Sequence, residues 1–112
     1  MKASYEHIVS WLEIVLSTKS LIIGNAILFG SVARSHPHPR DCDIAIVATG
    51  SPLSPNWIAL RRFLQKVRSD FQKTFGFPLS ILLLTPDEWF ECGRTVVSDR
   101  LPLSLYNPTK TG

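Results

Sequence analysis

The sequence has few cysteines and no long apolar run, and both absences narrow the class of protein. Cys42 and Cys92 are the only two thiols; they lie far apart and in no metal-ligand spacing. This excludes a disulfide-rich scaffold and a cysteine-based zinc site, and we expect both thiols to be reduced. The longest apolar stretch is interrupted by Lys19, Gly24 and Asn25. It therefore falls short of the roughly 18 apolar residues that cross a bilayer.

The N-terminal stretch "MKASYEHIVSW" lacks the apolar core of a secretory signal. Glu6 and His7 stand where that core would be. The sequence therefore predicts a cytoplasmic protein with no membrane association.

The chain also lacks a strong charge of either sign. Twelve Lys and Arg against nine Asp and Glu give a net charge of +3, and hydrophobic residues make up 45% of the chain. This composition is that of a globular domain and not of a disordered segment. The charge is too weak for a nucleic-acid footprint, so a small nucleic-acid-binding domain is the weakest of the functions we consider. The length of 112 residues predicts one domain over 1–112, with a core of about 21–92 and a C-terminal tail over 94–112.

Hydrophobic periodicity and capping signals predict alternating helices and strands. Apolar residues at helical spacing predict helices over 5–18 and from Ser54-Pro55 to Gly76. "TPDE", beginning at Thr85, is a capping box that opens a short helix through about Glu91. Strands are expected over 21–29 (or only 26–29, if Gly24-Asn25 is a turn), 43–48 and 78–84. The segment "LPLSLY" is either an edge strand or an extended packing arm. The fold class is α/β (α+β), a small mixed β-sheet flanked by helices.

A Gly-Ser turn follows the first expected strand. Gly30 has no side chain, so its backbone can approach a bulky anion closely. Ser31 can cap a short helix through "SVAR", whose free amides would point at that anion. Arg34 adds positive charge one turn further on. These three residues are therefore candidates for binding a phosphate chain.

Two aspartates lie at the start of the next strand. Asp41 and Asp43 are separated by Cys42, and side chains alternate along a strand, so we expect both carboxylates on one face and the thiol on the other. Paired carboxylates are hard oxygen ligands that suit Mg²⁺. Each motif alone is common in solvated loops, but their order within one strand–loop–strand unit favours a joint site for a polyphosphate and a metal ion.

At these residues the sequence resembles the minimal nucleotidyltransferase family of the DNA polymerase β-like superfamily, whose motif is Gly-Ser-x-Ala-Arg followed by Ser-Asp-x-Asp. Here the motif reads "GSVAR" and "RDCDIAIV". The resemblance implies Mg²⁺-dependent transfer of a nucleoside monophosphate from a triphosphate, with ATP as the expected donor, to a protein or small-molecule acceptor. It implies that Asp41 and Asp43 are catalytic metal ligands and that Gly30 and Ser31 hold the triphosphate. It also implies an antitoxin role beside a small helical HEPN-type partner protein.

The sequence departs from the family pattern at three positions. Ser35 stands where the family usually has glycine, and Arg40 where serine is common. Ser80 stands on the third strand where active members commonly place an aspartate, so the general base or second-metal ligand is missing. Asp87 and Glu88 lie beyond that strand and are candidates to replace the missing carboxylate, but they stand in the capping box, and we interpret capping as their main role. The alternative function is therefore a catalytically inactive binding module of the same fold that binds a partner protein.

Three further features bear on packing and on possible partners. Trp57 and Trp89 lie near helix starts, and we expect them to pack against the sheet. An exposed edge strand or the apolar tail offers a way to form a homodimer. One helix face is basic, and we interpret it as solvated in preference to a nucleic-acid or acidic-partner surface; it consists of Arg61, Arg62, Lys66 and Arg68.

Overall fold

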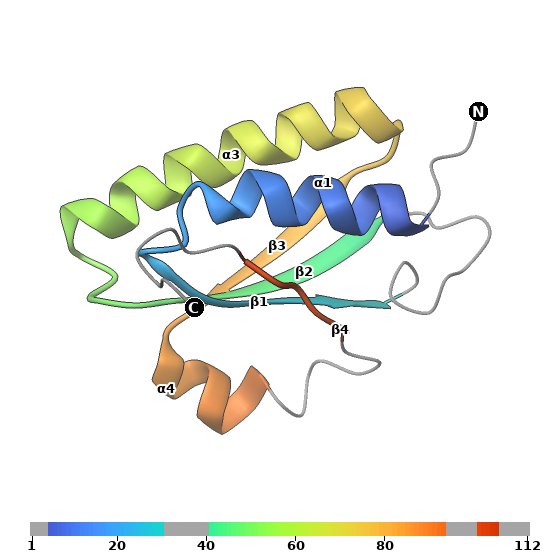
Figure 1. The fold of residues 1–112 in the computed structure, drawn as a ribbon. Coiled ribbons are helices and arrows are strands. Elements are labelled where there is room, and N and C mark those ends of the chain that lie inside the picture. The colour runs from blue at the N-terminus through green and yellow to red at the C-terminus, as the bar shows by residue number, and fades with distance from the viewer. Residues whose placement is uncertain (1–4, 31–40, 94–100, 106–112) are drawn as a thin grey trace, which may run out of the picture.

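A mixed sheet of four strands organises the chain. The computed structural model describes residues 5–30, 41–93 and 101–105. The central strands are antiparallel to each other, while the third strand runs parallel to the second and the short fourth strand antiparallel to the first. This confirms the predicted α/β class with a mixed sheet (Figure 1). In the order β3-β2-β1-β4, the strands are β3 (Leu79–Leu84), β2 (Cys42–Ala48), β1 (Ile23–Phe29) and β4 (Leu101–Pro102).

The two long helices cover one face of the sheet. These are α1 (Tyr5–Ser17) and α3 (Pro55–Phe75), and α3 is the crossover that two neighbouring parallel strands require. A short helix, α4 (Pro86–Glu88), continues into the π-helical turn η1 (Trp89–Gly93) on the opposite face (Figure 1). The described residues therefore cover that face only in part.

Local signals fix both ends of α3, as the sequence predicts. The Ser54 hydroxyl accepts a hydrogen bond from the Trp57 amide, and Pro55 occupies the first helical position. Gly76 ends the helix with φ +83°, and its amide donates to the Gln72 carbonyl.

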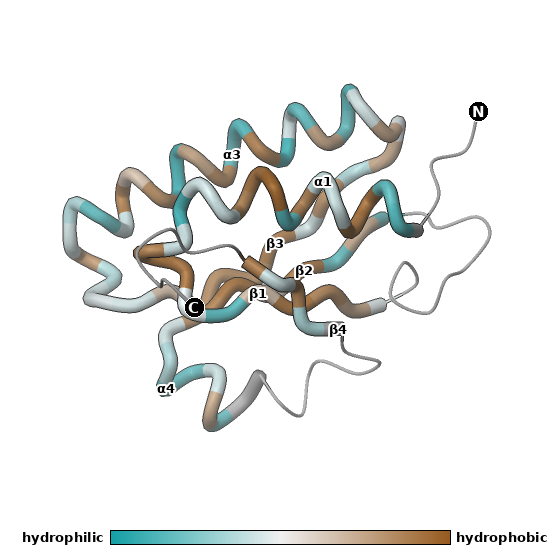
Figure 2. The backbone as a smooth tube through the Cα atoms, in the orientation of Figure 1, coloured by the Kyte–Doolittle hydropathy of each residue, from teal (hydrophilic) through white to brown (hydrophobic). Residues whose placement is uncertain are grey.

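The main core lies between the long helices and the sheet. Alternate β2 side chains (Cys42, Ile44, Ile46 and Ala48) are fully buried there. Figure 2 shows the central strands as mainly hydrophobic and α3 as alternating between hydrophilic and hydrophobic residues. From α3 the core receives one stripe: Trp57, Leu60, Leu64, Val67 and Phe71. The predicted core role of Trp57 is confirmed.

The C-terminal segment packs against this chain's own core. Two residues of β4 pair with β1, and the next amide, that of Leu103, donates to the Ala26 carbonyl at 2.8 Å. Leu103 is buried, and the Glu13 carboxylate on α1 accepts a hydrogen bond from the Ser104 amide. The segment is thus both an edge strand and a packing arm.

The predictions were wrong in detail at two places. The first strand begins at Ile23, and its pairing with β2 shifts between Ile23 and Asn25. Gly24 and Asn25 are exposed, so the strand is not buried on both faces over its whole length. The short helix predicted through Glu91 keeps regular α-helical form only to Glu88. Within the described ranges, none of the helices is long and apolar enough to cross a membrane.

Candidate functional site

Asp43 lies on the sheet face opposite the two long helices. Its β2 neighbours Cys42 and Ile44 are buried beneath those helices, whereas Asp43 is only half-buried. Alternation along the strand therefore places its carboxylate on the other face, as predicted. In the register of the sheet, Asp43 lies between Phe29 of β1 and Ser80 of β3.

Gly30 and the Asp43 carboxylate are in close proximity. Gly30 has φ +76°, a conformation that L side chains rarely adopt. A Cβ atom added to Gly30 would lie 2.5 Å from Asp43 Oδ2, a distance shorter than any non-bonded contact of that kind allows. A side chain here would therefore strain the backbone and force the Asp43 carboxylate to move, because the turn and the carboxylate lie against each other. The sequence analysis expects both aspartates to lie beside this turn; the contact found is with Asp43, and the site itself stays a prediction.

Asp41 and Asp43 influence each other electrostatically. Burial raises the pKa of Asp43 above its ordinary value of 3.8, and the negative charge of Asp41 raises it further. A carboxylate whose ionised form is disfavoured by burial and by a like charge gains from a nearby cation.

Cys42, between the two aspartates, has no part in the site. Its side chain is fully buried in the core under the helices. Burial, together with the charges of Asp43 and Asp41, raises the pKa of its thiol to about 12. The thiol is therefore protonated at neutral pH and inert as a nucleophile.

Ser80 is the direct neighbour of Asp43 on β3, and its side chain is exposed. The residues that follow β3 are used to cap a helix. Glu88 Oε1 accepts from the Thr85 amide at 2.9 Å, and the Thr85 hydroxyl accepts from the Glu88 amide at 3.1 Å. The predicted capping box is confirmed, so Glu88 is engaged away from Asp43.

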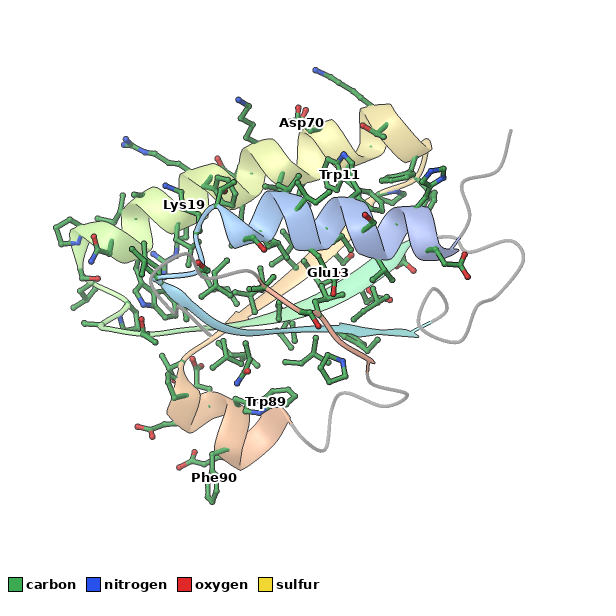
Figure 3. All side chains as sticks on the ribbon, viewed as in Figure 1. Trp11, Glu13, Lys19, Asp70, Trp89 and Phe90 are labelled. Carbon is green, nitrogen blue, oxygen red and sulfur yellow. The ribbon has the colours of Figure 1, made fainter. Side chains whose placement is uncertain are left out.

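The rest of this sheet face is apolar and partly covered. Trp89 packs against a small cluster formed by Ile27, Ala45 and Val47, and Phe29 adjoins the same cluster. Figure 3 shows Trp89 directed toward the sheet and Phe90 directed away from it. The predicted sheet packing of Trp89 is confirmed. The sequence analysis missed Phe29 as a site neighbour; its place next to Gly30, in a strand antiparallel to β2, was the available signal.

The donor set fits a magnesium ion. Among the described residues there is no cluster of three or more His, Cys, Asp or Glu side chains that could hold a metal ion. Mg²⁺ is nevertheless often bound by one or two carboxylates together with substrate phosphates and water. Asp41 and Asp43 offer two carboxylates that interact electrostatically, and magnesium binding by them stays a prediction. The other two predicted phosphate-binding residues, Ser31 and Arg34, lie outside the described residues.

Comparisons with known proteins add no relative to this picture. Neither a protein-family model nor a curated protein matches the chain. The resemblance to nucleotidyltransferases therefore rests on the residues of the two motifs and stays a prediction.

Proposed function

We propose that this protein binds a nucleoside triphosphate with Mg²⁺ where β1 ends and β2 begins, and that it transfers the nucleoside monophosphate to an acceptor. ATP is the proposed donor. The acceptor is a protein or a small molecule, and the motif resemblance suggests a small helical partner of the HEPN type.

One observation carries this proposal: the contact between the Gly30 turn and the Asp43 carboxylate. A Cβ atom at Gly30 would lie 2.5 Å from Asp43 Oδ2. A bare backbone turn of this kind admits a phosphate group to the main chain. The adjacent carboxylate would repel that phosphate unless a cation lay between them. A triphosphate accompanied by a divalent cation satisfies both groups at once.

In the proposed reaction, an acceptor hydroxyl attacks the α-phosphorus and the bond to the β,γ-diphosphate breaks. Bound Mg²⁺ would supply neutralisation of the phosphate charge during this step. Asp41 and Asp43 would hold the cation, and the Gly30 turn would position the phosphates against it. The acceptor proton would leave to solvent, because Ser80 is a poor base.

The alternative function is a binding module that holds the nucleotide or a partner without transfer. It is favoured by Ser80, whose position next to Asp43 offers a hydroxyl where a third carboxylate would complete the site. Both functions need the same cation site, so a binding experiment tests their common basis first.

Calorimetric titration of ATP, with and without Mg²⁺, tests that basis. We expect binding that requires Mg²⁺ and is lost in Asp43→Asn. Asp87→Asn is the matched control, because Asp87 is an exposed carboxylate on α4. Magnesium-independent binding, or equal losses in the two variants, would contradict the proposed site.

Label transfer separates the enzyme from the binding module. The protein is incubated with ATP labelled in the α-phosphate, Mg²⁺ and a small helical protein of the HEPN type as acceptor. Transfer that is lost in Asp43→Asn supports the enzyme. Binding without transfer in the wild type, with transfer gained in Ser80→Asp, supports the module.

A further inference from the structure

The outward surface of α3 carries cations that the fold itself does not use. The helix has five basic residues, and two are engaged within the molecule. The Arg61 guanidinium lies 5.7 Å from the centre of the Trp57 ring, and Arg68 Nε donates to the Leu79 carbonyl at 3.2 Å. The other three are exposed, and no ion pair joins them to any described residue: Arg62, Lys66 and Lys73.

These three cations form one stripe along the helix. At about 100° per residue, Arg62, Lys66 and Lys73 fall within an arc of about 40°, and they span about 16 Å of helix. The arc lies opposite the buried residues of α3. Figure 3 shows long basic side chains projecting from α3 away from the sheet. We refer to Arg62, Lys66 and Lys73 as the cationic stripe.

The helix does not neutralise this stripe. Asp70 is the only carboxylate in α3. It stands four residues after Lys66 and three before Lys73, at spacings that commonly give ion pairs on a helix. No such pair forms among the described residues. Within the described part of the chain, the three positive charges are therefore not neutralised by an ion pair.

Apolar side chains adjoin the N-terminal end of the stripe. Leu53 is 90% exposed and Ile58 is 47% exposed. Leu53 immediately precedes the cap residue Ser54, and Ile58 is the fourth residue of the helix. Side chains at these two positions often pack together as a hydrophobic staple. Here the outer surfaces of both remain open to solvent. Ile58 lies about 40° from Arg62 around the helix, so apolar and basic side chains share one outward surface.

We propose that this surface of α3 docks an acidic amphipathic segment of a partner protein. Carboxylates of that segment face the cationic stripe, and an apolar side chain covers Leu53 and Ile58. A nucleic acid fits less well, because its phosphates gain nothing from Leu53 and Ile58, and because the aromatic residue at this end, Trp57, is buried in the core. The surface lies on the far side of the molecule from Asp43, so the proposal is independent of the nucleotide site.

A synthetic peptide of defined charge tests the proposal. The probe is a fluorescent amphipathic helix with glutamates spaced as the cationic stripe is, and with leucines at one end. Its binding to the full chain is followed by fluorescence anisotropy at low salt. The stripe variant is Arg62→Gln/Lys66→Gln. The matched control is Arg61→Gln/Arg68→Gln, which removes the same charge from the side of the same helix. Circular dichroism checks that each variant is folded.

We expect the stripe variant to bind the peptide about tenfold more weakly and the control to bind within about twofold of the wild type. Leu53→Ser should also weaken binding. Equal losses in the two double variants would overturn the proposal, because binding would then follow net charge alone. Failure to bind the peptide, or stronger binding of an oligonucleotide of similar length, would also overturn it.

Discussion

Gly30 is the residue at which backbone conformation and neighbouring side chain act together. A positive φ disfavours most side chains on conformational grounds, and even a methyl group would require the Asp43 carboxylate to move. Gly76 has a similar φ of +83° but no atom within 4 Å of its ideal Cβ position. The chain therefore offers two glycines that differ only in what lies beside them.

We predict that Gly30→Ala abolishes Mg²⁺-dependent ATP binding, because the new methyl group displaces the Asp43 carboxylate. Gly76→Ala is the control. Each substitution should cost about 1–2 kcal/mol of stability from the left-handed backbone alone. Calorimetry and urea unfolding measure the two effects separately. If Gly76→Ala lost ATP binding as well, the loss would reflect instability and not the site.

Asp43 also makes stability depend on pH. Its pKa in the folded chain is raised above the ordinary value of 3.8. At pH values between the ordinary pKa and the raised pKa, the folded state therefore binds more protons than the unfolded state. The unfolding free energy contributed by this group therefore falls as pH rises through that interval. Above it, the ionised carboxylate is a net cost to the fold.

We predict that Asp43→Asn is more thermally stable than the wild type at pH 7, and that the difference shrinks at pH 4. Thermal unfolding of both proteins at the two pH values gives the difference directly, so contributions from other groups cancel. A variant that is less stable at pH 7 would mean that the carboxylate stabilises the fold through its contacts.

Alternation along a strand was enough to predict that Asp43 and Cys42 face opposite sides. The contact between Gly30 and Asp43 could not be predicted from the alternation of side chains along a strand. It depends on the antiparallel register that pairs Phe29 with Asp43. That register links residues on either side of a loop, and no local pattern specifies it.

The sequence predicts the two ends of α3 more clearly than those of the other elements. Its N-cap, its first-turn proline and its terminal glycine all act within a few residues. Local signals of this kind survive in any tertiary context. By contrast, the start of β1 depends on how Ile23 and Asn25 meet β2, which is why the predicted start was too early.

We predict that Ser54→Ala lowers the unfolding free energy by about 1 kcal/mol, because the Trp57 amide loses its hydroxyl acceptor. Ser69→Ala is the matched control. Ser69 is an exposed residue within the same helix, where alanine has the better helix propensity. Urea unfolding of the two variants should therefore give changes of opposite sign, or a loss in Ser54→Ala alone.

At the scale of the whole molecule, the C-terminal segment joins α1 and β1. The sequence left its role open between an edge strand and a packing arm, since the partners of such a segment are distant along the chain. The structure supplies those partners: the Ala26 carbonyl for the Leu103 amide, and the Glu13 carboxylate for the Ser104 amide. The segment therefore covers the side of β1 that β2 leaves free, close to the strand end at which Gly30 lies.

We predict that Leu103→Ala lowers the unfolding free energy by about 2–4 kcal/mol, the usual cost of removing a leucine side chain from a core. Leu103 is 7% exposed and belongs to the main core cluster. Leu53→Ala is the control, because Leu53 is 90% exposed and its loss should change stability by less than about 0.5 kcal/mol. Urea unfolding measures both. A loss below about 1 kcal/mol in Leu103→Ala would show that the segment is only loosely attached. In that case the segment would not support β1 beside the proposed nucleotide site. Replacing Leu103 should then leave ATP binding unchanged.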